Sequence, residues 1–337
     1  MTCLTGELGR MMKHVFVLNP AAGQGNAIHD YKNQIMDCAR SLNCDFDVYI
    51  TQGVADAKNF VAAYDQHDEY CRYYACGGDG TLHEVINGAF GKPHCEVAVI
   101  PSGTGNDFIR NFTNSKNFSD IERQIQGESI LIDLIRYNHG YAVNMVNIGY
   151  DCRVVARSAK LKQYPLISGT MAYISGVAIE LFKKFGDQME LIFDNGQMLS
   201  DQYLLCSVAN GAFCGGGFCS SSEASVTDGF LDVNVIKKMS RGRFLSLLGD
   251  YKKGNLYYSN KSQGVFDYIR CREVRIRQKS KSLFCIDGEI YSQDELTFSV
   301  EPQAIRFCIP YGSFLLSEAS ASDPVKLENS KQRVTVE

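Results

Sequence analysis

Short apolar runs alternate with longer amphipathic segments over the first hundred residues of the chain. The apolar runs are HVFVL (14–18), FDVYI (46–50), YYAC (73–76) and VAVI (97–100). The segments between them end near Leu42, Tyr64 and Phe90 and have the length of helices. This alternation is typical of βαβ units and predicts a parallel sheet with helices on its faces. In such sheets ligands bind beyond the carboxyl ends of the strands.

After about residue 130 the pattern changes to strands separated by turns. The turn sequences are YNHGY (137–141), DNG (194–196), TDG (227–229) and IDG (286–288). They predict a second, mainly antiparallel β domain. Residues 171–185 and 241–253 are helix-like exceptions. The first has an apolar stripe at helical spacing, which predicts a face packed on the core rather than on lipid. The stripe comprises Met171, Ile174, Ala178, Leu181, Phe182 and Phe185.

Length and composition agree with two domains. The chain has 337 residues, of which 45% are hydrophobic and 21% charged, and this is too long for one small core. We predict domains at residues 12–142 and 143–312, followed by a polar, frayed tail at 316–337. The net charge of -4 gives no general attraction to nucleic acid or anionic lipid, so any such contact requires a local patch.

Cysteine usage and hydropathy indicate the cellular setting. The thirteen cysteines are scattered and form no CxxC pair, which indicates reduced thiols in a cytosolic protein. The N-terminal residues lack the apolar core of a signal peptide. The longest uncharged window, residues 163–179, contains Pro165 and two glycines and falls short of the roughly 18 apolar residues that a membrane span needs. We therefore expect a soluble or peripheral protein.

Three of the four early strands end in glycine-rich turns that precede helices. The turns are NPAAGQGNA (19–27), GGDGT (77–81) and PSGTGND (101–107). Glycines let backbone N–H groups approach a ligand closely, and a helix N-terminus adds partial positive charge, so such turns can hold phosphate. Any βα turn can use Gly and a polar cap, but three in series favour the functional interpretation. None is a Walker A loop or a dinucleotide fingerprint.

The second turn contains two kinds of carboxylate. Thr81 and Glu84 match the T-x-x-E capping box, which predicts that both side chains cap the following helix. Asp79 lies before that helix, where its charge would repel phosphate unless a cation lies between them. A Mg²⁺-bound nucleotide would supply that cation.

The order and spacing of these motifs carry a family resemblance. NPAAGQG (19–25), GGDGTLHEVING (77–88) and PSGTGNDFIR (101–110) resemble the catalytic domain of the diacylglycerol kinase family, which also contains sphingosine, ceramide and bacterial lipid kinases. The resemblance covers about residues 14–312. It continues through NIGYD (147–151), GGG (215–217), TDGFLDV (227–233) and IDGE (286–289). Many relatives carry a proline near position 222, where this chain has Ser222. The implied fold is an α/β domain like that of phosphofructokinase and NAD kinase, followed by a β-sandwich, with ATP in the cleft.

The resemblance also implies roles for individual residues. Asp79, Asp107 and Asp133 would belong to a water-linked network around Mg²⁺. For Asp107 a helix-cap role is the alternative, whereas Asp133 lies in an apolar strand, where a lone carboxylate is costly unless paired or used. The residues implied around ATP are Asn19, Ala22, Gly23, Thr51, Gly77, Gly78, Asp79, Gly80, Thr81, Leu82, His83, Ser102, Gly103, Thr104 and Asn106.

The late IDGE segment has two compatible interpretations. Its local sequence predicts a hairpin with a two-residue Asp-Gly turn. The resemblance makes it catalytic, with Asp287 or Glu289 as the general base and Asp79 contributing to catalysis through the metal. Because the base must reach across the cleft, domain closure is expected to control turnover.

Two further sites are predicted outside the nucleotide loops. The resemblance implies a structural second metal on the Asp228 carboxylate and the main-chain oxygens of Ser225 and Phe230, with a plain Asp-Gly turn as the alternative. The basic segment 270–281 is either a membrane-facing patch or a strand with one solvated face. Residues 157–165 are a second basic candidate. No aromatic interleaving suggests nucleic-acid binding.

The expected function is that of an ATP-dependent kinase for a membrane lipid, most simply diacylglycerol. Alternatives are another lipid alcohol (a sphingoid base, ceramide or phosphatidylglycerol), a soluble substrate as in NAD kinase, or a nucleotide-binding regulator without catalysis. The expected cofactors are ATP and Mg²⁺, and the expected location is the cytoplasm, peripheral on the inner face of the membrane. A homodimer is left open.

Overall fold

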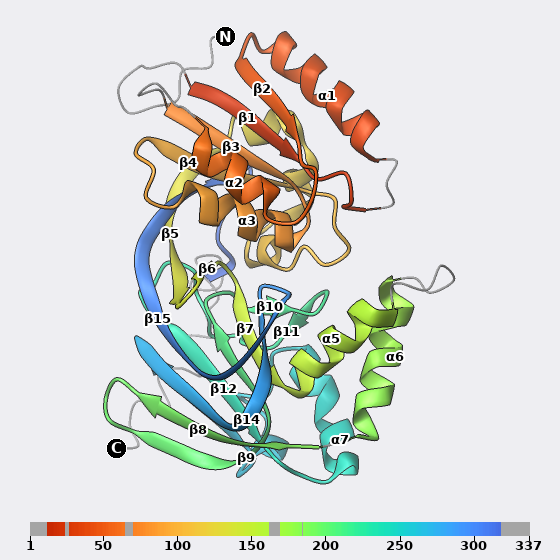
Figure 1. The fold of residues 1–337 in the computed structure, drawn as a ribbon, viewed down its shortest axis with the longest axis vertical. Helices are drawn as coiled ribbons and strands as arrows, with labels where there is room; N and C mark the ends of the chain where they lie inside the picture. Colours follow the sequence, from red (N-terminus) through yellow and green to blue (C-terminus); the bar gives the residue numbers. More distant parts are fainter. Residues whose placement is uncertain (1–11, 24–26, 65–69, 162–168, 184, 318–337) are drawn as a thin grey trace.

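The computed structural model describes residues 12–23, 27–64, 70–161, 169–183 and 185–317. Two domains lie one above the other and share strands that run through both (Figure 1). Most of the predicted tail, residues 318–337, lies outside the described residues. None of the described helices is long and apolar enough to cross a membrane.

The N-terminal domain contains the predicted parallel sheet. Its strands are β1 (Met12–Leu18), β2 (Asp45–Ile50), β3 (Tyr70–Gly77) and β4 (Cys95–Pro101), in the order β4-β3-β1-β2. Its helical elements are α1 (Ala27–Ser41), α2 (Asp56–Ala63), α3 (Asp79–Ala89), α4 (Ile121–Ile125) and the 3₁₀ turns η1 (Phe108–Asn111) and η2 (Ser115–Ser119). Alternate strand residues point to opposite faces, so Val15 packs with α2 and α3, whereas Phe16 packs with α1 and α4. Both faces of the sheet are therefore buried, as the continuous apolar runs predict.

The C-terminal domain is mainly antiparallel, as predicted. The strands are β5 (Glu128–Tyr137), β6 (Gly140–Ala142), β7 (Met145–Gly149), β8 (Asp187–Phe193), β9 (Met198–Ala209), β12 (Leu231–Lys237), β13 (Phe266–Cys271), β14 (Glu273–Ile286) and β15 (Glu289–Ile309), with a small hairpin of β10 (Phe213–Cys214) and β11 (Phe218–Cys219). The helices are α5 (Tyr150–Leu161), α6 (Gly169–Leu181), α7 (Arg241–Lys252) and the 3₁₀ turn η3 (Asn260–Ser262). Helix α5 has no counterpart in the predicted elements.

Strand β15 connects the two domains. Its first half pairs with β14 in the sandwich, and its last residues pair with β5 and run parallel to β4. Ile305, Phe307 and Ile309 are buried in the core of the N-terminal domain. The last residues of the predicted second domain therefore contribute to the core of the first domain. The chain crosses between the domains along β5 and β15 (Figure 1).

The predicted capping box is wrong. Helix α3 begins at Asp79 with Gly78 as its N-cap, so Thr81 lies inside the first turn and its hydroxyl accepts a hydrogen bond from Asn19 Nδ2 (2.9 Å). Glu84 instead accepts the backbone N–H groups of Ala55 (2.8 Å) and Ala57 (3.1 Å) at the start of α2. The glycine turn moves the N-cap three residues earlier than the motif indicates, from Thr81 to Gly78, and Glu84 is then on the face next to α2.

The core face predicted for residues 171–185 is also wrong for three of its six members, whereas Leu181 does pack against the core. Phe185 is buried, but Met171, Ala178 and Phe182 are exposed, and the side chain of Ile174 lies outside the described residues. Helix α6 packs on α5 through small residues, because a Cβ on Gly176 would lie 2.8 Å from Ser158 Oγ. That close approach turns the face with Gly176 inward and leaves the apolar stripe outward.

Candidate active site

The three glycine-rich turns meet at the carboxyl edge of the parallel strands. Ser102 N donates to Gly77 O (2.9 Å), and a Cβ on Gly103 would lie 2.6 Å from Gly78 Cα. Gly23 has φ +72°, and a Cβ there would lie 2.9 Å from Ser102 O. The glycines are therefore needed for the loops to pack against one another, and the packed loops gather the backbone of all three turns at one place.

The residues predicted around ATP lie on or beside these turns. Asn19 holds the first turn through its own side chain, whose Oδ1 accepts from Ala21 N (2.9 Å), and Ala22 N donates to Asn19 O (3.2 Å). Asn106 Nδ2 donates to Gly103 O (2.7 Å) in the third turn. Thr51 follows β2, and Thr51 N donates to Leu18 O (2.9 Å). Leu82 is buried in the core, so only its main chain remains for a nucleotide, whereas Thr104 is exposed.

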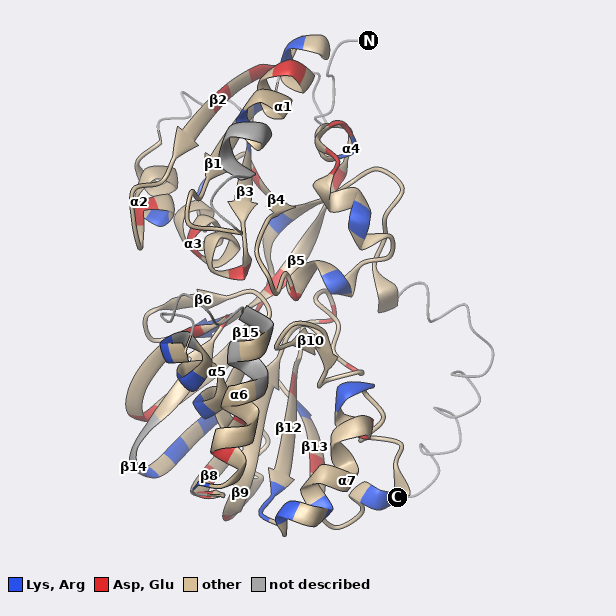
Figure 2. Cartoon of the chain, turned by 90° about the vertical axis from the view of Figure 1, so that its right-hand side faces the viewer, with Lys and Arg blue, Asp and Glu red and all other residues tan. Residues whose placement is uncertain are grey.

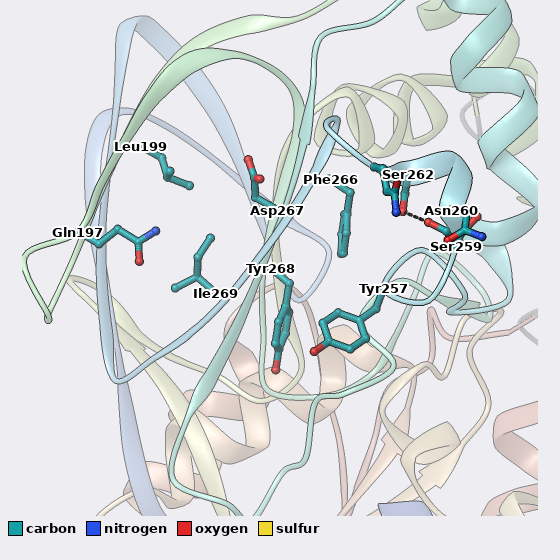
Figure 3. Close-up of a pocket in the computed structure, with 11 residues that line it drawn as sticks. Gln197, Leu199, Tyr257, Ser259, Asn260, Ser262, Phe266, Asp267, Tyr268 and Ile269 are labelled. Atoms are coloured by element: carbon teal, nitrogen blue, oxygen red, sulfur yellow. Dashed lines mark hydrogen bonds between the residues drawn. The ribbon is translucent and has the colours of Figure 1, made fainter. Parts of the chain in front are cut away.

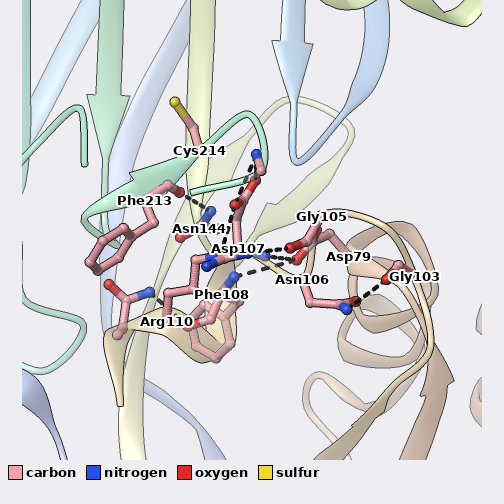
Figure 4. Close-up of polar contacts among 12 residues, drawn as sticks. Asp79, Gly103, Gly105, Asn106, Asp107, Phe108, Arg110, Asn144, Phe213 and Cys214 are labelled. Carbon is pink, nitrogen blue, oxygen red and sulfur yellow. Dashed lines mark hydrogen bonds and ion pairs between the residues drawn. The ribbon is translucent and has the colours of Figure 1, made fainter. Parts of the chain in front are cut away.

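Asp79 and Asp107 form the charged centre of the site (Figure 4). Asp79 Oδ1 accepts the N–H groups of Asp107 (2.9 Å) and Phe108 (3.4 Å). The Asp107 carboxylate accepts Gly216 N at 2.9 and 3.1 Å from its two oxygens and pairs with Arg110 Nε (3.4 Å). Burial and the nearby Asp107 charge raise the pKa of Asp79 to about 6. The partly exposed guanidinium of Arg110 therefore pairs with Asp107, whereas Asp79 is held by backbone N–H groups.

This pair fits a divalent cation. A buried and a partly buried carboxylate with incomplete positive compensation are the setting in which Mg²⁺ binds through few protein oxygens, water and substrate phosphate. Asp79 and Asp107 would hold the ion. Among the described residues no group of three or more His, Cys, Asp or Glu side chains is arranged to hold a metal on its own.

Asp133 has partners of a different kind. Its Oδ2 accepts Gly229 N and its Oδ1 accepts Gln303 N, both at 2.7 Å. These bonds explain why a carboxylate is tolerated in an apolar strand, and they join Asp133 to the Asp228 turn and to β15. Its membership of a magnesium network with Asp79 and Asp107 stays a prediction.

Asp287 occupies the predicted two-residue turn, since Ile286 pairs with Glu289 and Asp287 has φ +46°. Its carboxylate accepts the N–H groups of Val143 (2.7 Å), Asn144 (3.0 Å) and Met145 (3.1 Å) and the Nδ1–H of His83 (3.0 Å). Its side chain is 1% exposed. Burial opposes protonation of His83, but the hydrogen bond and charge of Asp287 outweigh it and raise the pKa of His83. Asp287 therefore joins α3 to the C-terminal domain and has little capacity left to accept a substrate proton.

Glu289 presents the accessible carboxylate of the IDGE segment. It is exposed at the first position of β15. A Cβ on Gly80 would lie 3.7 Å from Glu289 Oε1, so the carboxylate faces the first turn of α3, next to Asp79. Sequence alone left Asp287 and Glu289 equivalent; the structure gives them different surroundings.

The basic segment 270–281 spans the end of β13 and part of β14, and three of its four arginines have carboxylate partners. Arg277 pairs with Glu295 (2.6 Å) and Glu190 (3.2 Å), and Arg275 approaches Glu295 (3.9 Å). Figure 2 shows the basic residues along β14 and a second basic group on α5. The cross-strand pairs favour the solvated-face interpretation of β14.

The sandwich also contains a hollow away from the phosphate loops (Figure 3). It has a volume of about 440 Å³ and is lined by residues of the β8–β9 turn, η3 and β13, including Gln197, Tyr257 and Tyr268. None of the predicted site residues lines it.

The raised pKa of Asp79 gives a pH prediction. Protonation of this carboxyl removes the charge that would bind Mg²⁺, so kcat/KM should fall as the pH drops below about 6. More Mg²⁺ should shift the midpoint to lower pH, because the ion binds the charged form. Initial rates from pH 5 to 8 at two Mg²⁺ concentrations measure this, and a midpoint independent of Mg²⁺ would contradict it.

Comparisons with known proteins agree with the geometry. The sequence model described as "Diacylglycerol kinase catalytic domain" matches residues 13–137. The model described as "YegS C-terminal NAD kinase beta sandwich-like domain" matches residues 144–309. A Shewanella frigidimarina protein named "Probable lipid kinase YegS-like" is 29% identical over 271 residues, which are 78% of this chain and 84% of that protein.

A solved structure shows the same fold. The crystal structure of a diacylglycerol kinase from Bacillus anthracis strain Sterne superposes with a TM-score of 0.67 at 19% identity, over 89% of this chain and 97% of that one. The two matching sequence models together span nearly all of the described fold. The chain therefore belongs to the lipid kinase family in which a diacylglycerol kinase catalytic domain is followed by a YegS-type β-sandwich domain.

Proposed function

We propose that this protein transfers the γ-phosphate of ATP to the free hydroxyl of a membrane lipid, with diacylglycerol as the substrate and phosphatidic acid as the product. The observation that supports this most is the position of Glu289. An exposed carboxylate on the C-terminal domain faces the first turn of α3, where Asp79 and the glycine turns lie. A base and a phosphate-binding edge therefore face each other across the domain boundary.

The chain's own residues support the following chemistry. The backbone of the three turns and the N-terminus of α3 would bind the phosphates of ATP. Mg²⁺ held by Asp79 and Asp107 would neutralise charge on the transferred group. Glu289 would take the proton of the lipid hydroxyl as its oxygen forms the new bond to the γ-phosphorus. The bond from that phosphorus to the β–γ bridging oxygen breaks, and ADP leaves. His83 and Asp287 would hold the turn that positions Glu289.

The alternatives predict different products. A kinase for a sphingoid base, ceramide or phosphatidylglycerol would use the same centre, and a soluble-substrate kinase would need no lipid. A regulator without catalysis would not need Glu289. Transfer of labelled phosphate from ATP to these lipids in mixed micelles, and to NAD, separates the possibilities. Labelling of diacylglycerol at the highest kcat/KM supports the proposal, and a higher value for another acceptor contradicts the choice of substrate.

We further propose that the protein acts at the cytoplasmic face of a membrane and contacts it through α6. The outward stripe includes Met171 on α6, which is 57% exposed, and Phe182 directly after the helix, which is 79% exposed. Residues 150–183 carry five basic and two acidic side chains, which suits an anionic lipid surface. The arginines of α5 and of β14 both have carboxylate partners, so the exposed apolar stripe is the feature that favours α6 over β14.

Replacing Met171 and Phe182 together by Ser should weaken binding to anionic vesicles by at least about 100-fold, because two apolar side chains are removed. Burying one large apolar side chain contributes roughly 1.5–3 kcal/mol. Vesicle sedimentation measures the effect, and kcat on a short-chain, water-soluble diacylglycerol should stay unchanged. Met198→Ser, at an exposed residue on the β8–β9 hairpin, is the matched control. Equal vesicle binding by the double variant and the wild type would place the contact elsewhere.

A further inference from the structure

An arginine from the neighbouring strand β13 lies at the loop that was predicted to hold a second metal. The predicted donors are the Asp228 carboxylate and the main-chain oxygens of Ser225 and Phe230. Asp228 Oδ1 accepts Phe230 N (3.0 Å), while its Oδ2 pairs with Arg270 Nη2 of β13. Both oxygens of the only carboxylate in the predicted donor set are therefore engaged.

The sheet register brings Arg270 to this loop. Strands β12 and β13 are antiparallel, and Arg270 lies directly opposite Asp232. From there its guanidinium reaches Asp228 and stacks over the Phe230 ring, with 4.3 Å from Cζ to the ring centroid. The side chain is thus fixed by an ion pair and a cation–π contact at once.

The loop connects to the strands that join the two domains. Gly229 N donates to Asp133 of β5, and the other oxygen of Asp133 accepts Gln303 N of β15. In addition, Asp133 N donates to Val226 O (2.7 Å). Asp133 and Asp228 repel each other, and the positive charge of Arg270 next to Asp228 offsets this repulsion.

We infer that Arg270 is the built-in cation of the 225–230 loop and replaces the structural divalent ion that the family resemblance implies. The residues present do not fit a metal, since a guanidinium lies on the carboxylate that would bind it. The loop of this chain therefore keeps its structure without Mg²⁺, and the Mg²⁺ of the proposed function acts at the nucleotide site alone.

Thermal unfolding of the nucleotide-free full-length protein tests this inference. Wild type, Asp228→Asn, Arg270→Gln and the double variant are each melted with EDTA and with ~10 mM Mg²⁺ or Ca²⁺. Wild type and Asp228→Asn should show the same metal-dependent change in Tm. Arg270→Gln should melt about 2 °C lower in EDTA and should regain part of this loss with metal, because the ion binds only the native loop. The double variant should regain none of it.

Arg272→Gln is the matched control. Arg272 also lies over Phe230, 5.1 Å from the ring centroid, but its backbone N–H donates to Asp194 and its guanidinium is not the partner of Asp228. This variant should show no metal response beyond that of the wild type. A metal response in the wild type that Asp228→Asn abolishes would overturn the inference, as would an Arg270→Gln variant with no added response.

Discussion

Replacing Glu289 by Gln is expected to lower kcat by a factor of about 10² to 10⁴, the usual contribution of a general base. Gln has the same shape but cannot accept the proton of the lipid hydroxyl. Because Glu289 is exposed, the variant should keep the Tm of the wild type. ATP binding should also be unchanged, since the phosphate-binding turns are untouched. Initial rates at saturating ATP, with Tm and ATP affinity measured in parallel, test this prediction.

Asp287→Asn is the matched comparison, because the two carboxylates are two residues apart. Asp287 accepts three backbone N–H groups and His83, and an amide would place its NH₂ against some of these donors. This variant should have a lower Tm and a lower kcat than the wild type. The fall in kcat is expected because the turn that positions Glu289 is disturbed. A stable Asp287→Asn variant that is inactive, beside an active Glu289→Gln variant, would make Asp287 the base.

Replacing Asp79 by Asn is expected to lower kcat by about 10² to 10³, the effect of removing one charge-stabilising element. The stability of the nucleotide-free protein should not fall. The folded state raises the pKa of Asp79 to about 6 from 3.8. The protonated carboxyl is therefore favoured by folding, and this stabilisation is lost as the pH rises through about 6. At pH 7.5 the ionised carboxylate opposes folding, and a neutral Asn removes that cost.

A control for Asp79 comes from the sandwich domain. Burial also raises the pKa of Asp232 to about 6, and its carboxylate accepts a hydrogen bond from Tyr268. Asp232→Asn therefore removes a similar buried charge outside the phosphate loops, and kcat should stay within a few-fold of the wild type. If Asp79→Asn has near wild-type kcat, or if both variants lose activity equally, Asp79 has no special role in catalysis.

The parallel sheet and the Asp-Gly hairpin could be predicted because their signals are local. Each early strand is a short apolar run, three of the four are followed by a glycine-rich turn, and both faces of that sheet are buried. The IDG turn needs positive φ at both central residues, which Asp and Gly tolerate, and the structure has +46° and +95° there.

Other features depend on contacts that no local pattern specifies. His83 and Asp287 are 204 residues apart in the sequence. Their hydrogen bond is one reason why Asp287 has a different environment from Glu289. The apolar stripe of α6 does not reveal which side packs on α5, and the small residue Gly176 decides that. Arg270 reaches Asp228 only through the register of β12 and β13, so sequence could not show that a cation already lies at the loop.

The most direct test of the central claim is phosphoryl transfer itself. Purified full-length protein is incubated with γ-labelled ATP, Mg²⁺ and diacylglycerol in mixed micelles, beside the Glu289→Gln variant at the same ATP occupancy. The account predicts labelled phosphatidic acid from the wild type and at most about 1% of that rate from the variant. If the wild type binds ATP but labels no lipid, or if the variant labels lipid as fast as the wild type, the proposed catalytic centre is wrong.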